Sequence, residues 1–362
     1  MSTIDEIIVK TKQKDNYFEI IRAICIICVM LIHCQNGIEY EDSPLFSFNY
    51  DYWLIFRQFV NFPVAVFVFL TAYFTNITKV EQKPLKYYGS RVRRLVIPFL
   101  VWSILYSIIN IAKGGFNVDV TKIIFNIVTG QASTPLYYIV VLIQLVIITP
   151  LLIKCLRNKY LNLVALCITP TFLIIMYAYT YITKDQIPFY ATVFPGWFLF
   201  YYIGLHVKLN GFKSRKKDGA GSKNVSKALI IMGCALLFSI IECYGMLYLK
   251  FPVGFASSQV KISSFLYSFS LINLIFAVKG NKIITKVNFV TRIGNYSYGI
   301  FYVHCFWILI VSKGMSYIPS IHNILPVYQL IELSAILVLS MLSIIVTNKI
   351  IGNKLASKYL GF

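Results

Sequence analysis

The chain has 362 residues, of which 58% are hydrophobic and only 13% are charged. Soluble domains average about 45–50% apolar and about 25% charged residues, so the composition argues against a single water-soluble core and indicates a polytopic membrane protein. Lys and Arg total 34 against 14 Asp and Glu, a formal charge of +20. Such an excess would suggest a nucleic-acid partner in a soluble protein, so the distribution of the charges has to decide its meaning.

Apolar runs of about 20 residues, long enough to cross a bilayer, recur along the whole chain. They predict an all-α bundle of about ten transmembrane helices, built as one integral membrane domain over residues 1–362. The predicted spans are 18–37, 53–77, 94–112, 136–153, 160–182, 190–207, 228–249, 262–278, 294–312 and 327–348. The first run is not followed by a small-residue cleavage site, so we expect no cleaved signal. The spans and their loops leave no stretch over for a soluble catalytic domain, so we expect no appended domain.

The basic residues alternate between the loops of this map. With the N-terminus in the cytoplasm, 26 Lys and Arg fall on inner segments and six on outer loops, and Arg22 and Arg57 lie within spans. The positive-inside rule therefore predicts cytoplasmic N- and C-termini and a multi-pass protein of the cell membrane. Topology accounts for the charge, so we expect no nucleic-acid partner. The most polar stretch, 208–227, is expected to meet the anionic headgroups of membrane lipids.

The first span carries two costly side chains, Arg22 and His33. Ionisable residues within spans are functional candidates by default. Eleven residues of helix make three turns plus about 20° and a rise of about 16 Å, so both side chains share one face. In the alternative interpretation, Arg22 extends to the inner headgroups or pairs with Glu19, and His33 caps the outer end of the helix.

Three arginines follow the second span. Arg91 and Arg94 are three residues apart and share a helix face, where two guanidinium groups would suit a ligand that carries phosphate or pyrophosphate. We interpret Arg93 as an anchor at the inner membrane surface. All three could equally be such anchors.

The ninth span contains His304, preceded by Ser297 and Tyr298 on earlier turns. A buried histidine in a bundle is often only a contact between helices, so its role stays open. Glu332 in the last span is also costly, whereas His206 and His322 lie at the ends of spans or in loops and receive no role. Four scattered histidines without a carboxylate cluster predict no metal site.

Taken together, these segments resemble the prokaryotic membrane acyltransferase family 3. The family pattern of Arg, ten residues and His matches Arg22 and His33, and its Arg-x-x-Arg motif matches Arg91 and Arg94, with Pro98 beyond it. Other matched positions are Leu70, Tyr73, Phe74, Tyr138, Pro150, Gly294, Tyr296, Ser297 and His304. Thr71-Ala72 stands where the family usually has Ser-Gly, and Tyr137 stands in place of a common Trp.

The resemblance implies an O-acyltransferase that takes an acyl group, most often acetyl, from cytoplasmic acyl-CoA to a glycan or lipid-linked sugar. It implies that Arg91, Arg94 and Arg22 bind the CoA phosphates. His33 would act as general base or carry the acyl group briefly, and His304 is the alternative base or a residue that orients His33. The rise between Arg22 and His33 is comparable to the length of an extended pantetheine arm.

Two other functions remain open from the sequence. Intramembrane Arg and His also occur along the substrate pathways of transporters, so a polysaccharide or small-solute exporter is the alternative to an enzyme. A structural subunit of a synthase complex is the third. A glycan synthase complex and a homo-oligomer are the protein partners that we consider.

Overall fold

The computed structural model describes residues 16–34, 47–116, 118–211, 221–279, 288–318 and 324–362. Within these ranges the chain is helical and contains no strand. The helices are α2 (Tyr17–His33), α3 (Phe48–Phe59), α4 (Pro63–Tyr73), α5 (Ile77–Gln82), α6 (Pro84–Lys113), α7 (Val120–Thr129), η1 (Thr134–Leu136), α8 (Tyr137–Arg157), α9 (Lys159–Thr183), α10 (Pro195–Asn210), α11 (Gly221–Tyr248), α12 (Val253–Ala256), α13 (Ile262–Lys279), α14 (Phe289–Asn295), α15 (Ser297–Met315), α17 (Leu325–Ile351) and α18 (Asn353–Tyr359).

Eight helical segments in the described part of the chain are long and apolar enough to cross a membrane. They coincide with eight of the ten predicted spans, and α3 and α4 together form one of them. The prediction of an all-α, multi-pass membrane bundle is therefore confirmed.

The two remaining predicted spans, 18–37 and 190–207, contain shorter helices. Helix α2 has 17 residues and α10 has 16, which correspond to about 25 Å of rise. Both are enclosed by other helices: α2 contacts α4, α14, α15 and α17, and α10 contacts α4, α8 and α9. Their apolar residues therefore pack mainly against protein.

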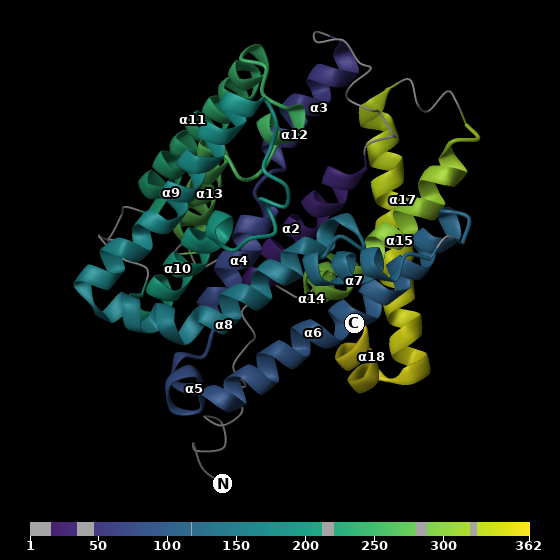
Figure 1. Ribbon diagram of the computed structural model, residues 1–362, viewed down its shortest axis with the longest axis horizontal. Coiled ribbons are helices and arrows are strands. Elements are labelled where there is room, and N and C mark those ends of the chain that lie inside the picture. Colours follow the sequence, from purple (N-terminus) through teal and green to yellow (C-terminus); the bar gives the residue numbers. More distant parts are fainter. Residues whose placement is uncertain (1–15, 35–46, 117, 212–220, 280–287, 319–323) are drawn as a thin grey trace.

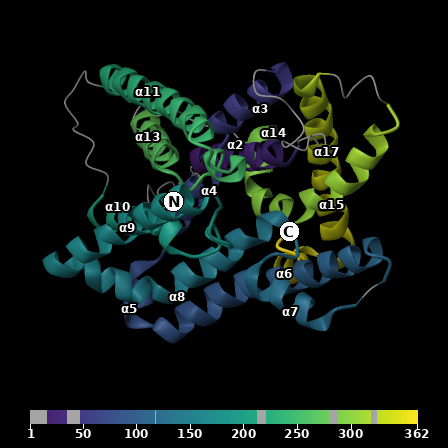
Figure 2. The ribbon, with the colours of Figure 1, turned by 45° about the horizontal axis from the view of Figure 1, so that its top comes forward.

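The helices form two groups with α2 between them. In Figures 1 and 2, α9, α10, α11 and α13 lie on one side of α2, and α15 and α17 lie on the other. Helix α13 packs on α11, while α6 pairs with α8. In the most apolar stretch of α9 and of α11, only 22% of the residues are buried, whereas 67% are buried in that of α3–α4. Helices α9 and α11 therefore present apolar side chains outward, as lipid contact requires.

Two glycines set close helix contacts around the centre. A Cβ on Gly294 of α14 would lie 1.8 Å from the backbone oxygen of Glu19 in α2, so only glycine allows these backbones to meet. A Cβ on Gly204 of α10 would lie 2.6 Å from the oxygen of Phe69 and 2.8 Å from the Cβ of Ala72. Gly204 is therefore the residue of α10 that lets α4 approach closely. The facing residue of α4 is Ala72.

Candidate active site

A cavity of about 820 Å³ lies where the ends of several helices converge around α2. Its lining contains five cationic side chains, from α2, α6, α10 and α13, and a single carboxylate. These are Arg22, Arg91, Arg94, Lys208 and Lys279, with Glu19 as the carboxylate. The cavity, which we call the cationic pocket, therefore has four more positive than negative side chains in its wall.

Arg22 is held in this wall by a residue of its own helix. Its Nη1 donates to both carboxylate oxygens of Glu19 at 2.9 Å. The guanidinium carbon also lies 5.1 Å from the ring centroid of Phe74, within the range of a cation–π contact. The ion pair that the spacing of Glu19 and Arg22 allowed is thus present, and Arg22 also lines the pocket.

The first turns of α6 place two more arginines on the pocket. Arg91 and Arg94 both line it, and the Nη2 of Arg91 donates to the backbone oxygen of Phe74 at 3.3 Å. The hydroxyl of Tyr298 donates to the backbone oxygen of Arg94 at 3.2 Å and ties α15 to α6. Arg93 is exposed and is absent from the lining.

Lys208 and Lys279 complete the wall, and each lies over an aromatic ring. The Nζ of Lys279 is 3.9 Å from the ring centroid of Phe18, and that of Lys208 is 5.9 Å from the ring centroid of Tyr73. Sequence reasoning counted both lysines only as inner-loop charges. The two lysines reach the pocket because α10 and α13 pack against α2 and α4. No local sequence pattern predicts this packing.

His33 lies in a second, smaller cavity of about 80 Å³. We call it the His33 chamber. It is enclosed by the end of α2 and by parts of α3, α4, η1, α8, α15 and the loop before α13. The lining residues with polar side chains are His33, Arg57, Thr134, Tyr137, Tyr138 and Gln259.

Arg57 is the cation of the His33 chamber. Its Nη1 donates to the backbone oxygen of Ile32 at 3.3 Å, and its guanidinium lies 5.9 Å from a ring centroid of Trp53. Sequence reasoning placed Arg57 at the end of a span and gave it no role. Its position within a span was the available signal.

His304 adjoins the chamber without lining it. Its ring centroid is 5.6 Å from that of His33, and the side chain is fully buried. The Nδ1 of His304 lies 3.0 Å from the backbone oxygen of Ile300; because that oxygen only accepts, Nδ1 carries the proton of the neutral ring. The thiol of Cys305, 3.4 Å from Nε2, is then the donor of their contact.

Three aromatic residues separate the two cavities and line both of them: Phe67, Tyr138 and Phe301. The ring centroids of Phe67 and Tyr138 are 6.3 Å apart, and those of Tyr138 and Phe301 are 5.4 Å apart. Phe301 also lies 6.2 Å from the ring of His304. We call these residues the aromatic partition. Arg22 and His33, which share a face of α2, thus lie on opposite sides of it.

Within the described ranges, no group of three or more His, Cys, Asp or Glu side chains is placed to hold a metal ion. His206 is exposed, and its Nδ1 lies 3.3 Å from the Nδ2 of Asn210. His322 lies outside the described residues.

Comparison with known proteins gives one match. The family model of acyltransferase family 3, described as an acyltransferase domain, matches residues 15–348. No curated protein and no solved structure matches the chain.

Proposed function

The chain belongs to acyltransferase family 3 and is a multi-pass membrane acyltransferase, and on that premise we propose that it moves an acetyl group from acetyl-CoA to a sugar hydroxyl. The acceptor in this proposal is a glycan or lipid-linked sugar at the cell membrane. The observation that carries the proposal is that the cationic pocket and the His33 chamber share the three side chains of the aromatic partition. A donor can then be bound in one cavity and react in the other.

The cationic pocket suits the donor. Coenzyme A carries a pyrophosphate and a ribose phosphate, and forked guanidinium groups bind phosphate oxygens in pairs. Arg91 and Arg94, with Arg22 below them, would hold these groups, and Lys208 and Lys279 would add charge at the rim. A volume of about 820 Å³ is that of a small-molecule site.

The proposed orientation in the membrane follows from the same residues. Arg91, Arg94, Lys208 and Lys279 all belong to segments that the positive-inside rule assigns to the cytoplasm. The cationic pocket would therefore open to the compartment that supplies acyl-CoA. Arg57 lies near the outer end of its predicted span and Gln259 lies in a predicted outer loop. The acceptor would therefore approach the His33 chamber from the opposite side.

The chemistry would proceed in the His33 chamber, after the pantetheine arm passes the aromatic partition. A nitrogen of neutral His33 takes the proton of the acceptor hydroxyl as its oxygen attacks the thioester carbonyl. The carbon–sulfur bond then breaks, the ester forms, and the CoA thiolate receives the proton from the imidazolium. Arg57 would stabilise the negative charge that develops on the carbonyl oxygen. His304, whose Nδ1 proton is committed to Ile300, would orient the ring of His33.

The family match favours acyl transfer over export of polysaccharide or another solute, the alternative that intramembrane Arg and His leave open. Among the described residues, no contact in the two cavities specifically favours transport.

The test is transfer of label from radiolabelled acetyl-CoA to endogenous glycan in inverted membrane vesicles. Wild type is compared with His33→Ala and with His206→Ala, the matched control, because His206 is exposed and lines neither cavity. Loss of a general base costs about 10²- to 10⁴-fold, so we expect His33→Ala to lose label by at least 100-fold while His206→Ala retains it.

Equal labelling by wild type and His33→Ala would remove His33 from the chemistry. An absence of label with wild type, repeated with succinyl-CoA as donor, would contradict the proposed function. If His33→Ala left the acyl content of the glycan normal and reduced the export of polymer, the result would instead favour the transporter.

A further inference from the structure

A buried ion pair fixes the loop that leads into α13. Lys261 is fully buried, and its Nζ donates to the backbone oxygen of Ser239 at 3.0 Å and lies 3.9 Å from Oε2 of Glu242. Burial lowers the pKa of the Lys261 ammonium, while the nearby Cys243 and Glu242 act in the opposite direction. A buried cation is tolerated only where such partners are held in place.

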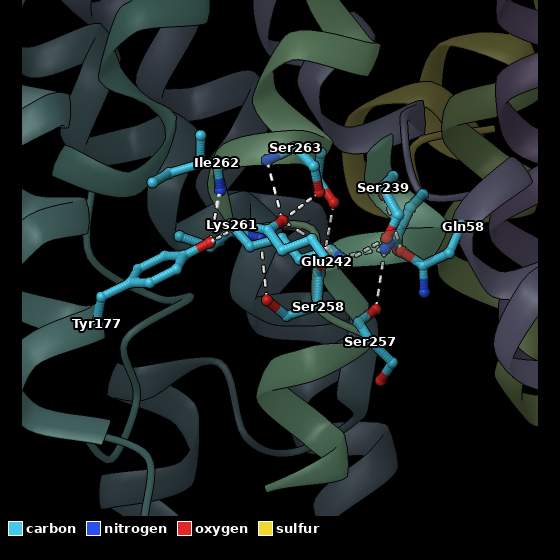
Figure 3. Close-up of polar contacts among 12 residues, drawn as sticks. Gln58, Tyr177, Ser239, Glu242, Ser257, Ser258, Lys261, Ile262 and Ser263 are labelled. Atoms are coloured by element: carbon cyan, nitrogen blue, oxygen red, sulfur yellow. Dashed lines mark hydrogen bonds and ion pairs between the residues drawn. The ribbon is translucent and has the colours of Figure 1, made fainter. Parts of the chain in front are cut away.

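Glu242 is held from two further helices, as Figure 3 shows. The hydroxyl of Tyr177 in α9 donates to its Oε1 at 2.6 Å, and the backbone nitrogen of Ser263 donates to Oε2 at 3.1 Å. The Ser263 hydroxyl donates to the same oxygen. Beside the pair, the hydroxyl of Ser239 donates to Oε1 of Gln58 at 2.9 Å. Helices α3, α9, α11 and α13 therefore meet at this network.

The other end of the loop is anchored separately. The Nδ2 of Asn61 donates to the backbone oxygens of Ser257 and Ser258, both at 2.9 Å. The hydroxyl of Ser264 donates to the oxygen of Ser258 at 3.1 Å. Asn61 lies in the break between α3 and α4, two residues before Pro63. The loop is thus fixed on both sides of one residue, Gln259.

Gln259 lines the His33 chamber together with His33 and Arg57. Its side-chain Oε1 is buried and accepts no hydrogen bond from any residue that the structure describes. A buried acceptor without a donor costs about 1–3 kcal/mol, and few occur in folded proteins. Gln259 therefore combines a place in the wall of this cavity with a buried acceptor that no described residue satisfies, which is what a ligand contact requires.

We propose that Gln259 binds the acceptor: its Oε1 accepts a hydrogen bond from a second hydroxyl, adjacent to the one that is acylated. The inference rests on the proposed function and narrows it to acceptors that carry neighbouring hydroxyl groups, such as a sugar diol. A carboxamide oxygen only accepts, so its partner must be a donor. The proton of the reacting hydroxyl goes to His33, which leaves the neighbouring hydroxyl for Gln259.

The experiment compares two small surrogate acceptors, ethylene glycol and ethanol, with acetyl-CoA as donor in membrane vesicles. They are close in size, and only the first carries a neighbouring hydroxyl. One neutral hydrogen bond corresponds to about a two- to ten-fold preference for the diol. Gln259→Met removes the acceptor oxygen at similar length, and Gln259→Glu keeps an oxygen there.

Gln186→Met is the matched control. Gln186 also has a buried Oε1 without a hydrogen-bond partner among the described residues, but it lines neither cavity. We expect wild type, Gln259→Glu and the control to prefer ethylene glycol, and Gln259→Met to lose the preference while the protection of the protein by CoA against heat is unchanged. A general folding defect would reduce the acetylation of both alcohols equally, and it would lower the protection of the protein by CoA against heat.

The preference retained in Gln259→Met would overturn the inference. Where wild type labels the endogenous glycan but neither alcohol, the glycan decides: undiminished labelling by Gln259→Met overturns the proposal, and a loss confined to that variant supports it. No labelled ester from wild type in any assay would instead contradict the proposed function, so the two failures are distinguishable.

Discussion

The cationic pocket and the His33 chamber differ in size by an order of magnitude, about 820 against 80 Å³. The larger one has five cations in its wall and the smaller one has a single arginine beside a histidine. A wide, strongly charged cavity binds a ligand over many contacts, whereas a small one holds only a few atoms in fixed positions. Under the proposed function, this difference matches donor binding in the first cavity and bond formation in the second.

We expect the largest effect from replacing the arginines of the proposed donor site. We expect the double variant Arg91→Ala/Arg94→Ala to raise the KM for acetyl-CoA by about 100-fold, because each charge-assisted hydrogen bond contributes about 1.5–3 kcal/mol. The kcat should change little, since neither residue lines the His33 chamber. Steady-state transfer to endogenous glycan gives both constants.

Arg93→Ala is the matched control, because this arginine lies between the other two and is absent from the pocket lining. It should change the KM by less than about two-fold. If Arg93→Ala raised the KM as much as the double variant does, the three arginines would act by anchoring the protein at the membrane. That result would remove the donor site from α6.

The second test separates His33, which lines the chamber, from His304, which adjoins it. We expect His304→Gln to lower kcat by about ten-fold and to leave the KM for acetyl-CoA unchanged, because its ring contacts His33 and no cavity. His33→Gln should cost at least about 100-fold. Single-turnover transfer measures both. A larger loss in His304→Gln than in His33→Gln would exchange their roles.

The sequence predicts these two cavities unevenly. Arg22, Arg91 and Arg94 stand out as charges within or beside spans, and helical spacing alone separates Arg93 from its neighbours. Lys208 and Lys279 look like any other inner-loop charge, and they reach the pocket only because α10 and α13 pack against the centre of the bundle. Their contribution therefore depends on tertiary packing, which a single sequence does not reveal.

The fold shows the same unevenness. Eight spans follow from apolar length. Helices α2 and α10 have only 17 and 16 residues, and their apolar residues pack mainly against other helices of the bundle, so apolar length alone does not describe them. Gly294 stood in a family-like motif, yet its physical reason, the contact with the backbone of Glu19, appears only in three dimensions. Gln259 carries no charge and lies in no motif, so no sequence signal could have selected it.

The aromatic partition gives a third test, with a smaller effect. We expect Phe67→Ala to raise the use of butyryl-CoA relative to acetyl-CoA by about five- to ten-fold, because it removes a side chain that lines both cavities. This corresponds to the lower end of the about 1–3 kcal/mol that is typical of discrimination by a hydrophobic pocket. Competition between the two donors measures the ratio. Phe74→Ala, at the end of the same α4, is the control, because Phe74 lines only the cationic pocket; an equal change in both variants would show that the partition does not select the acyl group.

The smallest effect sharpens the electrostatic half of the comparison. Lys208 is exposed at the rim of the cationic pocket, and exposed charge contacts contribute about 0.2–1 kcal/mol. Lys208→Ala should therefore raise the KM for acetyl-CoA by about two- to three-fold at low salt. The effect should vanish above about 0.3 M salt, where the Debye length falls to about 6 Å and exposed charges are largely screened. Lys154→Ala, an exposed inner-segment lysine outside the lining, is the control. An equal, salt-sensitive change in both would mean that the field of the whole cytoplasmic face attracts the donor, whereas a change confined to Lys208 assigns the attraction to the pocket itself.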